Sequence, residues 1–203
     1  QDTVTRRYRP GALLAQVARA GQAATPLDEA CRKVLARLSD DSGLTAYLST
    51  LNQRETVVLQ RLNGSHPVQV LSPPGSRRAA SGTAMGRALL SRLTQDEFDA
   101  LYGADPARPL PMEGKDCPAT VGELAQRVAQ TRADRCGIVI DQAMPGIGAV
   151  AAAVRDPGSG ELRGLCLSFV SFQVDAARVA LLREALVRHV AALGRELNDP
   201  YWL

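Results

Sequence analysis

The sequence predicts an α+β domain in which an antiparallel sheet of about six strands is flanked by helices. Three observations support this. Segments with helical apolar spacing occur near both ends of the chain and in its middle. Two groups of three strand-like segments lie between them, and short turn sequences join the strands within each group, which favours antiparallel pairing. With 203 residues, 45% of them apolar, the chain is long enough for one domain with a substantial core.

The first group of strands follows a helix that Thr25 caps and Pro26 opens, with Gly43 as its stop. The expected strands are 44–51, 55–62 and 67–71, joined by Asn-Gln and Asn-Gly turns. Strand periodicity divides the first of them into two faces. Leu44, Ala46, Leu48 and Thr50 lie on one face, and Thr45, Tyr47, Ser49 and Leu51 lie on the other.

The middle of the chain is predicted to be helical over 82–93. Two capping boxes, Thr94-x-x-Glu97 and Thr120-x-x-Glu123, each begin a further helix, and the Pro-rich segment between them indicates a surface loop. The last third predicts strands at 138–141, 149–155 and 161–170, followed by a long helix over about 175–198.

Composition excludes several classes of function. The formal net charge is +3 and the basic residues are scattered, so charge alone does not indicate a nucleic-acid surface. The first residues are mostly polar, and no apolar run approaches the roughly 20 residues of a membrane helix. The four cysteines, Cys31, Cys117, Cys136 and Cys166, form no Cys-x-x-Cys pair, which favours reduced thiols in a cytoplasmic protein.

Motifs for catalysis and for cofactors are missing from the sequence. His66 and His189 have no cysteine or second histidine at metal-ligand spacing, so we expect no zinc site. There is no Gly-x-Ser-x-Gly elbow and no nucleotide-binding P-loop. We therefore expect no metal, no cofactor and no enzymatic activity.

The most informative segment is 73–91, where a loop dense in small residues leads directly into a helix. The first turn of a helix offers unpaired backbone N–H groups, which a carboxylate can approach when the side chains are small. An ordinary cap also explains the segment, with Ser81 or Thr83 as the capping residue and Gly86 allowing close packing.

This segment resembles the signature of the IclR family of bacterial transcription regulators. In that signature a Gly-x-Arg-x-Pro loop leads to Thr-Ala-x-Gly-Lys-Ala-x-Leu-Ala. The matching residues are Gly75, Arg77, Thr83, Ala84, Gly86, Ala88 and Leu90. The sequence departs from the signature or from common family residues at Ala79, Ser81, Arg87 and Gln142.

Other parts of the chain resemble the same family in the same order. Residues 8–11 are similar to the end of its DNA-binding wing, and 146–154 and 160–170 to two of its strands. Gly137 and Asp141 fall where the family has a Gly-Tyr segment and an acidic residue. The resemblance implies that 1–24 is the end of the wing plus a linker helix, with a strand at 3–9 and a helix at 12–20. It also implies that 25–203 is a GAF/PAS-like effector-binding domain, and that the family's winged helix-turn-helix would precede Gln1.

On this resemblance we expect the chain to bind a small organic acid, either aromatic or aliphatic. Its carboxylate is expected at the helix start near Gly82, bound by N–H groups around Thr83 and Ala84, with Asp141 accepting a hydrogen bond across the pocket. The expected apolar wall is Ala80, Ile147, Leu167 and Phe169, and Ala149 joins the expected site. The apolar residues assigned to the last strand favour a ligand with an apolar body. We further expect a homodimer or homotetramer, contact with operator DNA only through the N-terminal domain, and no membrane association.

Two alternatives remain open at this point. One is a thiol-dependent enzyme of similar architecture, for which Cys136 is the fair candidate because Arg135 precedes it. The other is a module for oligomerisation alone. A pocket lined by residues from both sheet and helix would argue against the second alternative.

The 203-residue chain is predicted to bind DNA weakly and without sequence preference, because its net charge is only +3 and its basic residues are scattered. An electrophoretic mobility-shift assay at two salt concentrations measures this. Tight, salt-resistant binding to one sequence would contradict the assignment of 25–203 as the effector domain alone.

Overall fold

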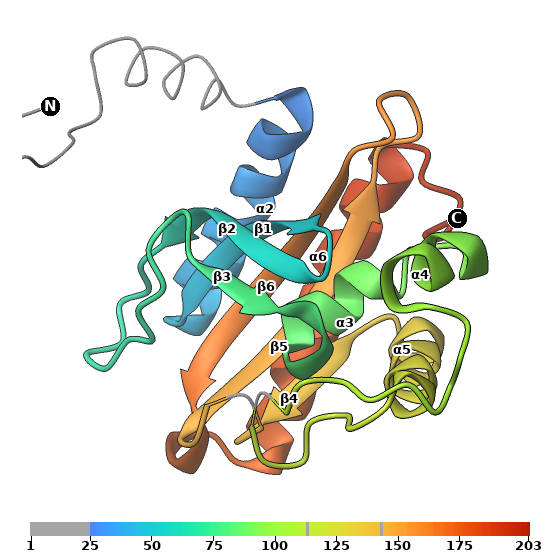
Figure 1. The fold of residues 1–203 in the computed structure, drawn as a ribbon. Coiled ribbons are helices and arrows are strands. Elements are labelled where there is room, and N and C mark those ends of the chain that lie inside the picture. Colours follow the sequence, from blue (N-terminus) through green and yellow to red (C-terminus); the bar gives the residue numbers. More distant parts are fainter. Residues whose placement is uncertain (1–24, 113, 143) are drawn as a thin grey trace, which may run out of the picture.

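The computed structural model describes residues 25–112, 114–142 and 144–203 (Figure 1). The strand at 3–9 and the helix at 12–20 that the sequence predicts therefore lie outside the described residues. The described chain folds around one antiparallel sheet with the strand order β3-β2-β1-β6-β5-β4. The predicted fold class, an α+β domain with six antiparallel strands and flanking helices, is confirmed.

The sheet consists of two hairpin-like halves that meet at its centre. The strands are β1 (Thr45–Asn52), β2 (Glu55–Leu62), β3 (Arg77–Ala79), β4 (Gly137–Ile140), β5 (Ile147–Arg155) and β6 (Leu162–Val170). The central pair is β1 and β6, in which Tyr47 lies opposite Cys166 and Thr45 opposite Ser168. Residues from opposite ends of the sequence therefore form the middle of the sheet.

Helices cover both faces of the sheet (Figure 1). On one face lie α2 (Pro26–Ser42) and α6 (Ala176–Glu196), which pack on Leu48, Val150, Leu165 and Leu167 in the largest apolar cluster. On the other face α3 (Ala84–Leu90) packs through Met85 and Leu89. Beyond α3, the helices α4 (Gln95–Tyr102) and α5 (Val121–Asp134) enclose a third cluster with Leu90. No helix in the described ranges is both long and apolar enough to cross a bilayer.

Local sequence signals set most helix boundaries. Thr25 and Thr94 each form a complete capping box, with Asp28 and Glu97 respectively. At Thr120 only half of the expected box forms, because the Glu123 carboxylate accepts from Ala119 N, 2.8 Å away, and not from the cap residue. Gly43 ends α2 in the left-handed conformation that glycine tolerates best (φ 74°).

The predicted strand at 67–71 is wrong. That segment is a loop, and β3 lies further along the chain, where Arg78 pairs with Thr56 at the start of β2. The loop is fixed by other contacts: the Tyr47 hydroxyl donates to Val70 O and accepts from Ser72 N at 3.3 Å. The edge of β2 at residues 55–57 pairs with the segment 77–79, so β3 and not 67–71 is the neighbour of β2 in the sheet.

The predicted helix at 82–93 is shorter in the structure. A single 3₁₀ turn, η1 (Ala80–Gly82), precedes α3, and Thr83 caps that helix by accepting a hydrogen bond from Gly86 N at 3.0 Å. Helix and turn pack closely, since a Cβ added to Gly86 would lie 2.1 Å from the carbonyl oxygen of Ala80. Only glycine fits at this position.

Replacing Gly86 with alanine is predicted to lower the free energy of unfolding by roughly 1–3 kcal/mol, because the added methyl group collides with backbone. Helix propensity alone predicts the opposite sign, since alanine is favoured over glycine by about 1 kcal/mol in a helix interior. Urea denaturation measures the difference. The control is Gln126→Ala on an exposed position of α5, where we expect a change within about 0.5 kcal/mol. A stabilised Gly86→Ala protein would show that η1 does not constrain α3.

Candidate effector pocket

A cavity lies between the sheet and the start of α3. Its volume is about 110 Å³, room for on the order of ten water molecules, and hence for a small organic molecule. Its walls come from all six strands, from the loop 70–76, and from the first residues of α3. Sheet and helix residues line it together, which argues against a module for oligomerisation alone.

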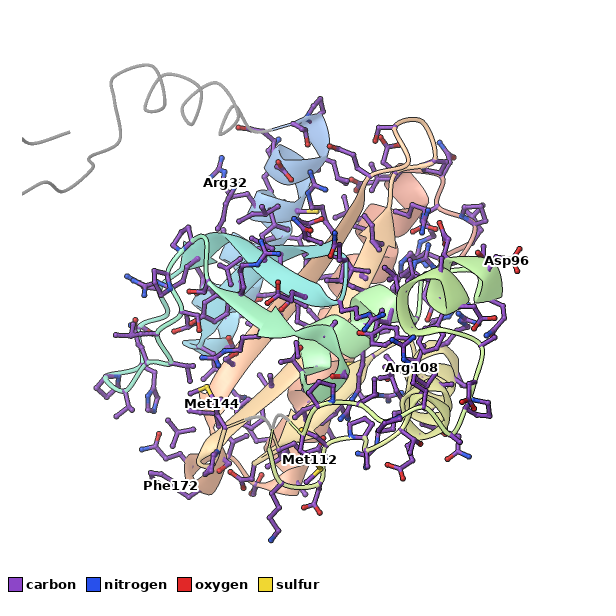
Figure 2. The ribbon with its side chains drawn as sticks, in the orientation of Figure 1. Arg32, Asp96, Arg108, Met112, Met144 and Phe172 are labelled. Atoms are coloured by element: carbon purple, nitrogen blue, oxygen red, sulfur yellow. The ribbon has the colours of Figure 1, made fainter. Side chains whose placement is uncertain are left out.

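Apolar side chains form much of the wall. Val58, Val70, Met85 and Val139 line it, and Met144 reaches it from the loop between β4 and β5 (Figure 2). Hydroxyl-bearing residues interrupt this surface at Tyr47, Ser49, Thr56, Ser72, Ser76, Thr83 and Ser168. An apolar cavity with a few dispersed polar groups is typical of small-molecule sites.

Arg78 is the single charged side chain among the described residues that line this cavity. It is exposed and has no carboxylate partner within ion-pair distance in the described part of the chain. Its neighbour Arg77 instead pairs with Glu55, with 2.8 Å between Nε and Oε2. The cavity therefore carries one positive charge that the protein does not neutralise.

Four of the nine residues expected from the sequence line the cavity. These are Thr83, Ala84, Ile147 and Ala149. In the first turn of α3 the N–H groups have no intrahelical acceptor, and one of them, that of Gly86, donates to the Thr83 hydroxyl oxygen. The small residues singled out in the sequence are thus brought to the edge of the cavity.

The expectation that Leu167 and Phe169 face the ligand is wrong by one residue of strand register. Both side chains are buried in the opposite face of the sheet, under α2 and α6. Side chains alternate along a strand, so Cys166 and Ser168 point into the cavity instead. Helices cover both faces of β6. Its sequence therefore lacks the alternation of apolar and polar residues that would show which side faces the cavity.

Asp141 does not line the cavity either. Its Oδ1 accepts a hydrogen bond from Gly146 N at 2.7 Å and another from the Ser171 hydroxyl at 2.8 Å. The carboxylate therefore closes the loop that leads into β5 and does not face the cavity, where the sequence prediction places it.

Ala80 and Gly82 lie close to the expected place but outside this cavity. Ala80 is fully buried behind α3, in the cluster with Leu90 and Phe98. Gly82 lines a second, neighbouring hollow. The segment that the sequence singled out borders both hollows, and the 3₁₀ turn decides in which direction each of its residues lies.

Arg87 connects α3 to the loop after β4. It is 4% exposed, its Nε donates to Ser81 O at 3.3 Å, and its Nη2 donates to Gln142 Oε1 at 2.6 Å. Burial lowers the pKa of the guanidinium to about 10, so it remains charged at neutral pH. Two of the four residues that depart from the IclR pattern, Arg87 and Gln142, are therefore hydrogen-bonded to each other.

Neither Cys136 nor Cys166 has the character of a nucleophile. Cys136, the candidate of the enzyme alternative, is 3% exposed, and burial raises its pKa to about 11. Burial also raises the pKa of Cys166, in the cavity wall, to about 12. A reactive cysteine needs a lowered pKa and access, and neither residue has both. Within the described ranges, no group of three or more His, Cys, Asp or Glu side chains is placed to bind a metal ion.

Comparison with known proteins agrees with this geometry. The family model for the C-terminal part of the bacterial transcriptional regulator IclR matches residues 22–195. The chain belongs to the IclR family. It is an effector-binding C-terminal domain of that family, and the resemblance seen in the sequence is confirmed.

Individual relatives support the assignment. The chain is 28% identical to the HTH-type transcriptional regulator XynR of Escherichia coli, over 98% of this chain and 78% of that protein. The repressor BlcR of Agobacterium tumefaciens is 25% identical and superimposes with a TM-score of 0.68, over 93% of this chain and 74% of that one. IclR of Thermotoga maritima, 17% identical, has the same fold with a TM-score of 0.78, over 94% of this chain and 76% of that one.

The register of β6 yields a direct test. Leu167→Ser is predicted to lower the free energy of unfolding by roughly 3–5 kcal/mol, since it leaves a cavity and a hydroxyl in the core. Ser168→Ala, the matched change one residue further, is predicted to cost less than about 1 kcal/mol because its side chain lies at the pocket. Chemical denaturation of both variants decides the register. Equal losses of stability would mean that both side chains are core residues.

Proposed function

We propose that this chain senses a small carboxylate-bearing metabolite and thereby controls the DNA binding of a transcription regulator. The observation that carries the proposal is the unneutralised guanidinium of Arg78 at a cavity that is otherwise lined by neutral side chains. An organic acid supplies the missing negative charge and fills the apolar space behind it.

The proposed position of the carboxylate is between Arg78 and the first turn of α3. Thr83 and Ala84 offer N–H groups there, and the Thr83 hydroxyl, which accepts from Gly86 N, still has its own proton to donate. The body of the ligand would lie against Val139, Ile147 and Ala149. A buried carboxylate without partners is costly, so these donors and the guanidinium must together replace its hydration.

Hydroxyl groups in the cavity wall favour a ligand that also carries a polar group. Ser49 on β1 and Ser168 on β6 line the cavity together with the apolar side chains. We therefore propose an aromatic or aliphatic acid that bears a hydroxyl or keto group, and not an unsubstituted fatty acid.

The regulatory step of the proposal is a shift between two conformations that bind the ligand unequally. The relatives are named as HTH-type regulators and as a repressor, which supports a DNA-binding partner domain and no catalytic role. We propose that the protein works as a homodimer or homotetramer in the bacterial cytoplasm, because two-fold operators require paired subunits.

A thermal-shift screen over aromatic and aliphatic hydroxy and keto acids should identify acids that raise the melting temperature, since a ligand that binds only the folded state stabilises it. With the best acid, Arg78→Gln is predicted to weaken binding roughly tenfold, because it removes a charge-assisted hydrogen bond. Calorimetric titration measures the dissociation constant. The control is Arg32→Gln, which removes the same charge from the exposed surface of α2.

Two outcomes would contradict the proposal. One is a screen in which neutral amides stabilise the protein as well as the acids do. The other is an Arg78→Gln protein that binds the acid as tightly as the Arg32→Gln protein.

A further inference from the structure

A second hollow lies beside the effector pocket, over the end of β3 and the turn η1. Its volume is about 340 Å³. We call it the arginine pocket, because Arg54, Arg77 and Arg78 line it together with Glu55, Tyr102 and the segment 81–83. Arg78 and Thr83 also line the effector pocket, so these two residues form the wall between the two.

The charge of the arginine pocket is unbalanced. Three guanidinium groups face one carboxylate, which leaves two positive charges. Glu55 pairs with Arg77, and both side chains are nearly half exposed, at 46% and 45%. The Nε of Arg54 donates to Leu101 O, and its guanidinium lies 5.5 Å from the centre of the Tyr102 ring. The outer nitrogens of Arg54 and of Arg78 therefore remain available to an anion.

Tyr102, which lines this hollow, carries a buried hydroxyl without a partner among the described residues. Tyr102 is 2% exposed, and its hydroxyl oxygen has no hydrogen-bond partner in the described part of the chain. An unsatisfied buried hydroxyl destabilises a fold by about 1–3 kcal/mol. Burial also raises the pKa of this hydroxyl to about 12, so it keeps its proton and is a donor.

We propose that the arginine pocket binds a small, multiply charged oxyanion, either inorganic phosphate or the phosphate group of a metabolite. Arg54 and Arg78 supply charge and paired N–H donors, whose fork geometry fits phosphate oxygens. The Tyr102 hydroxyl supplies a further donor and gains the partner that it lacks. Because Arg78 forms part of both walls, an anion here competes with the effector carboxylate for the same guanidinium.

Calorimetric titration of the 203-residue chain with inorganic phosphate, at constant ionic strength, tests the site. One saturable event is expected. Arg54→Gln is expected to weaken phosphate binding roughly tenfold, whereas Arg32→Gln, an exposed arginine of α2 (Figure 2), should leave it unchanged. Absence of saturation, or equal losses in the two variants, would overturn the proposal.

Tyr102→Phe provides a second test that does not depend on charge. Removal of an unpartnered hydroxyl should leave the melting temperature without phosphate equal or higher, and should reduce the rise that phosphate produces. A Tyr102→Phe protein with the full phosphate-dependent rise would contradict the role of the hydroxyl. Titration with methyl phosphate distinguishes the two sources of the anion. If methyl phosphate binds as tightly as inorganic phosphate, the ligand is the phosphate group of a metabolite; if methyl phosphate does not bind, the ligand is free phosphate.

The same variants keep this proposal separate from the proposed function. Arg54 and Tyr102 do not line the effector pocket, so Arg54→Gln and Tyr102→Phe should retain binding of the organic acid. Loss of phosphate binding with intact acid binding supports two sites. Parallel loss of both ligands in these variants would mean that one continuous site exists.

Discussion

The cavity exists because the sheet carries large side chains on one face and small ones on the other. On β6, Leu165, Leu167 and Phe169 fill the space under α2 and α6, whereas Gly164, Cys166 and Ser168 face α3. A Cβ on Gly164 would lie 2.3 Å from the Met85 sulfur, so the Met85 side chain packs directly against the backbone of β6. Next to the start of this short helix, the small side chains of the sheet leave space unfilled, and this space is the cavity.

The start of α3 determines where polar groups meet that cavity. Gly86 lets the 3₁₀ turn fold back onto the helix, and this contact places Thr83 and Ala84 at the cavity edge while it buries Ala80. The buried Arg87 then ties the turn, through Ser81 O, to Gln142 in the loop ahead of β5. One short helix thus positions the polar edge of the pocket and the loop opposite it.

Positive charge is concentrated at one hollow of the structure, although the net charge of the chain is small. A net charge of +3 spread over 203 residues conceals the convergence of Arg54, Arg77 and Arg78 around one hollow. Two arginines elsewhere are neutralised by carboxylates: Arg163 pairs with Asp28, which joins β6 to α2, and Arg92 pairs with the fully buried Asp199. Arg78 has no carboxylate partner in the described part of the chain and lies between the two pockets, so it is the group through which both proposed ligands would interact.

The sequence by itself determined the fold class, most helix boundaries and the segment that borders the pocket. Those features follow from local rules, since a capping threonine, a helix stop and an apolar repeat act over a few residues. The tertiary structure alone decided which segment pairs with β2, which face of β6 meets the cavity, and that Asp141 closes a loop. Which segment pairs with the edge of β2 depends on competition between distant parts of the chain, and this leaves no periodic signal in the sequence. Both faces of β6 are covered by helices, so its sequence has no alternation of apolar and polar residues that would show which face meets the cavity. Arg77 and Arg78 were only an adjacent pair in the sequence, and alternation along β3 directs one toward Glu55 and the other to the pocket.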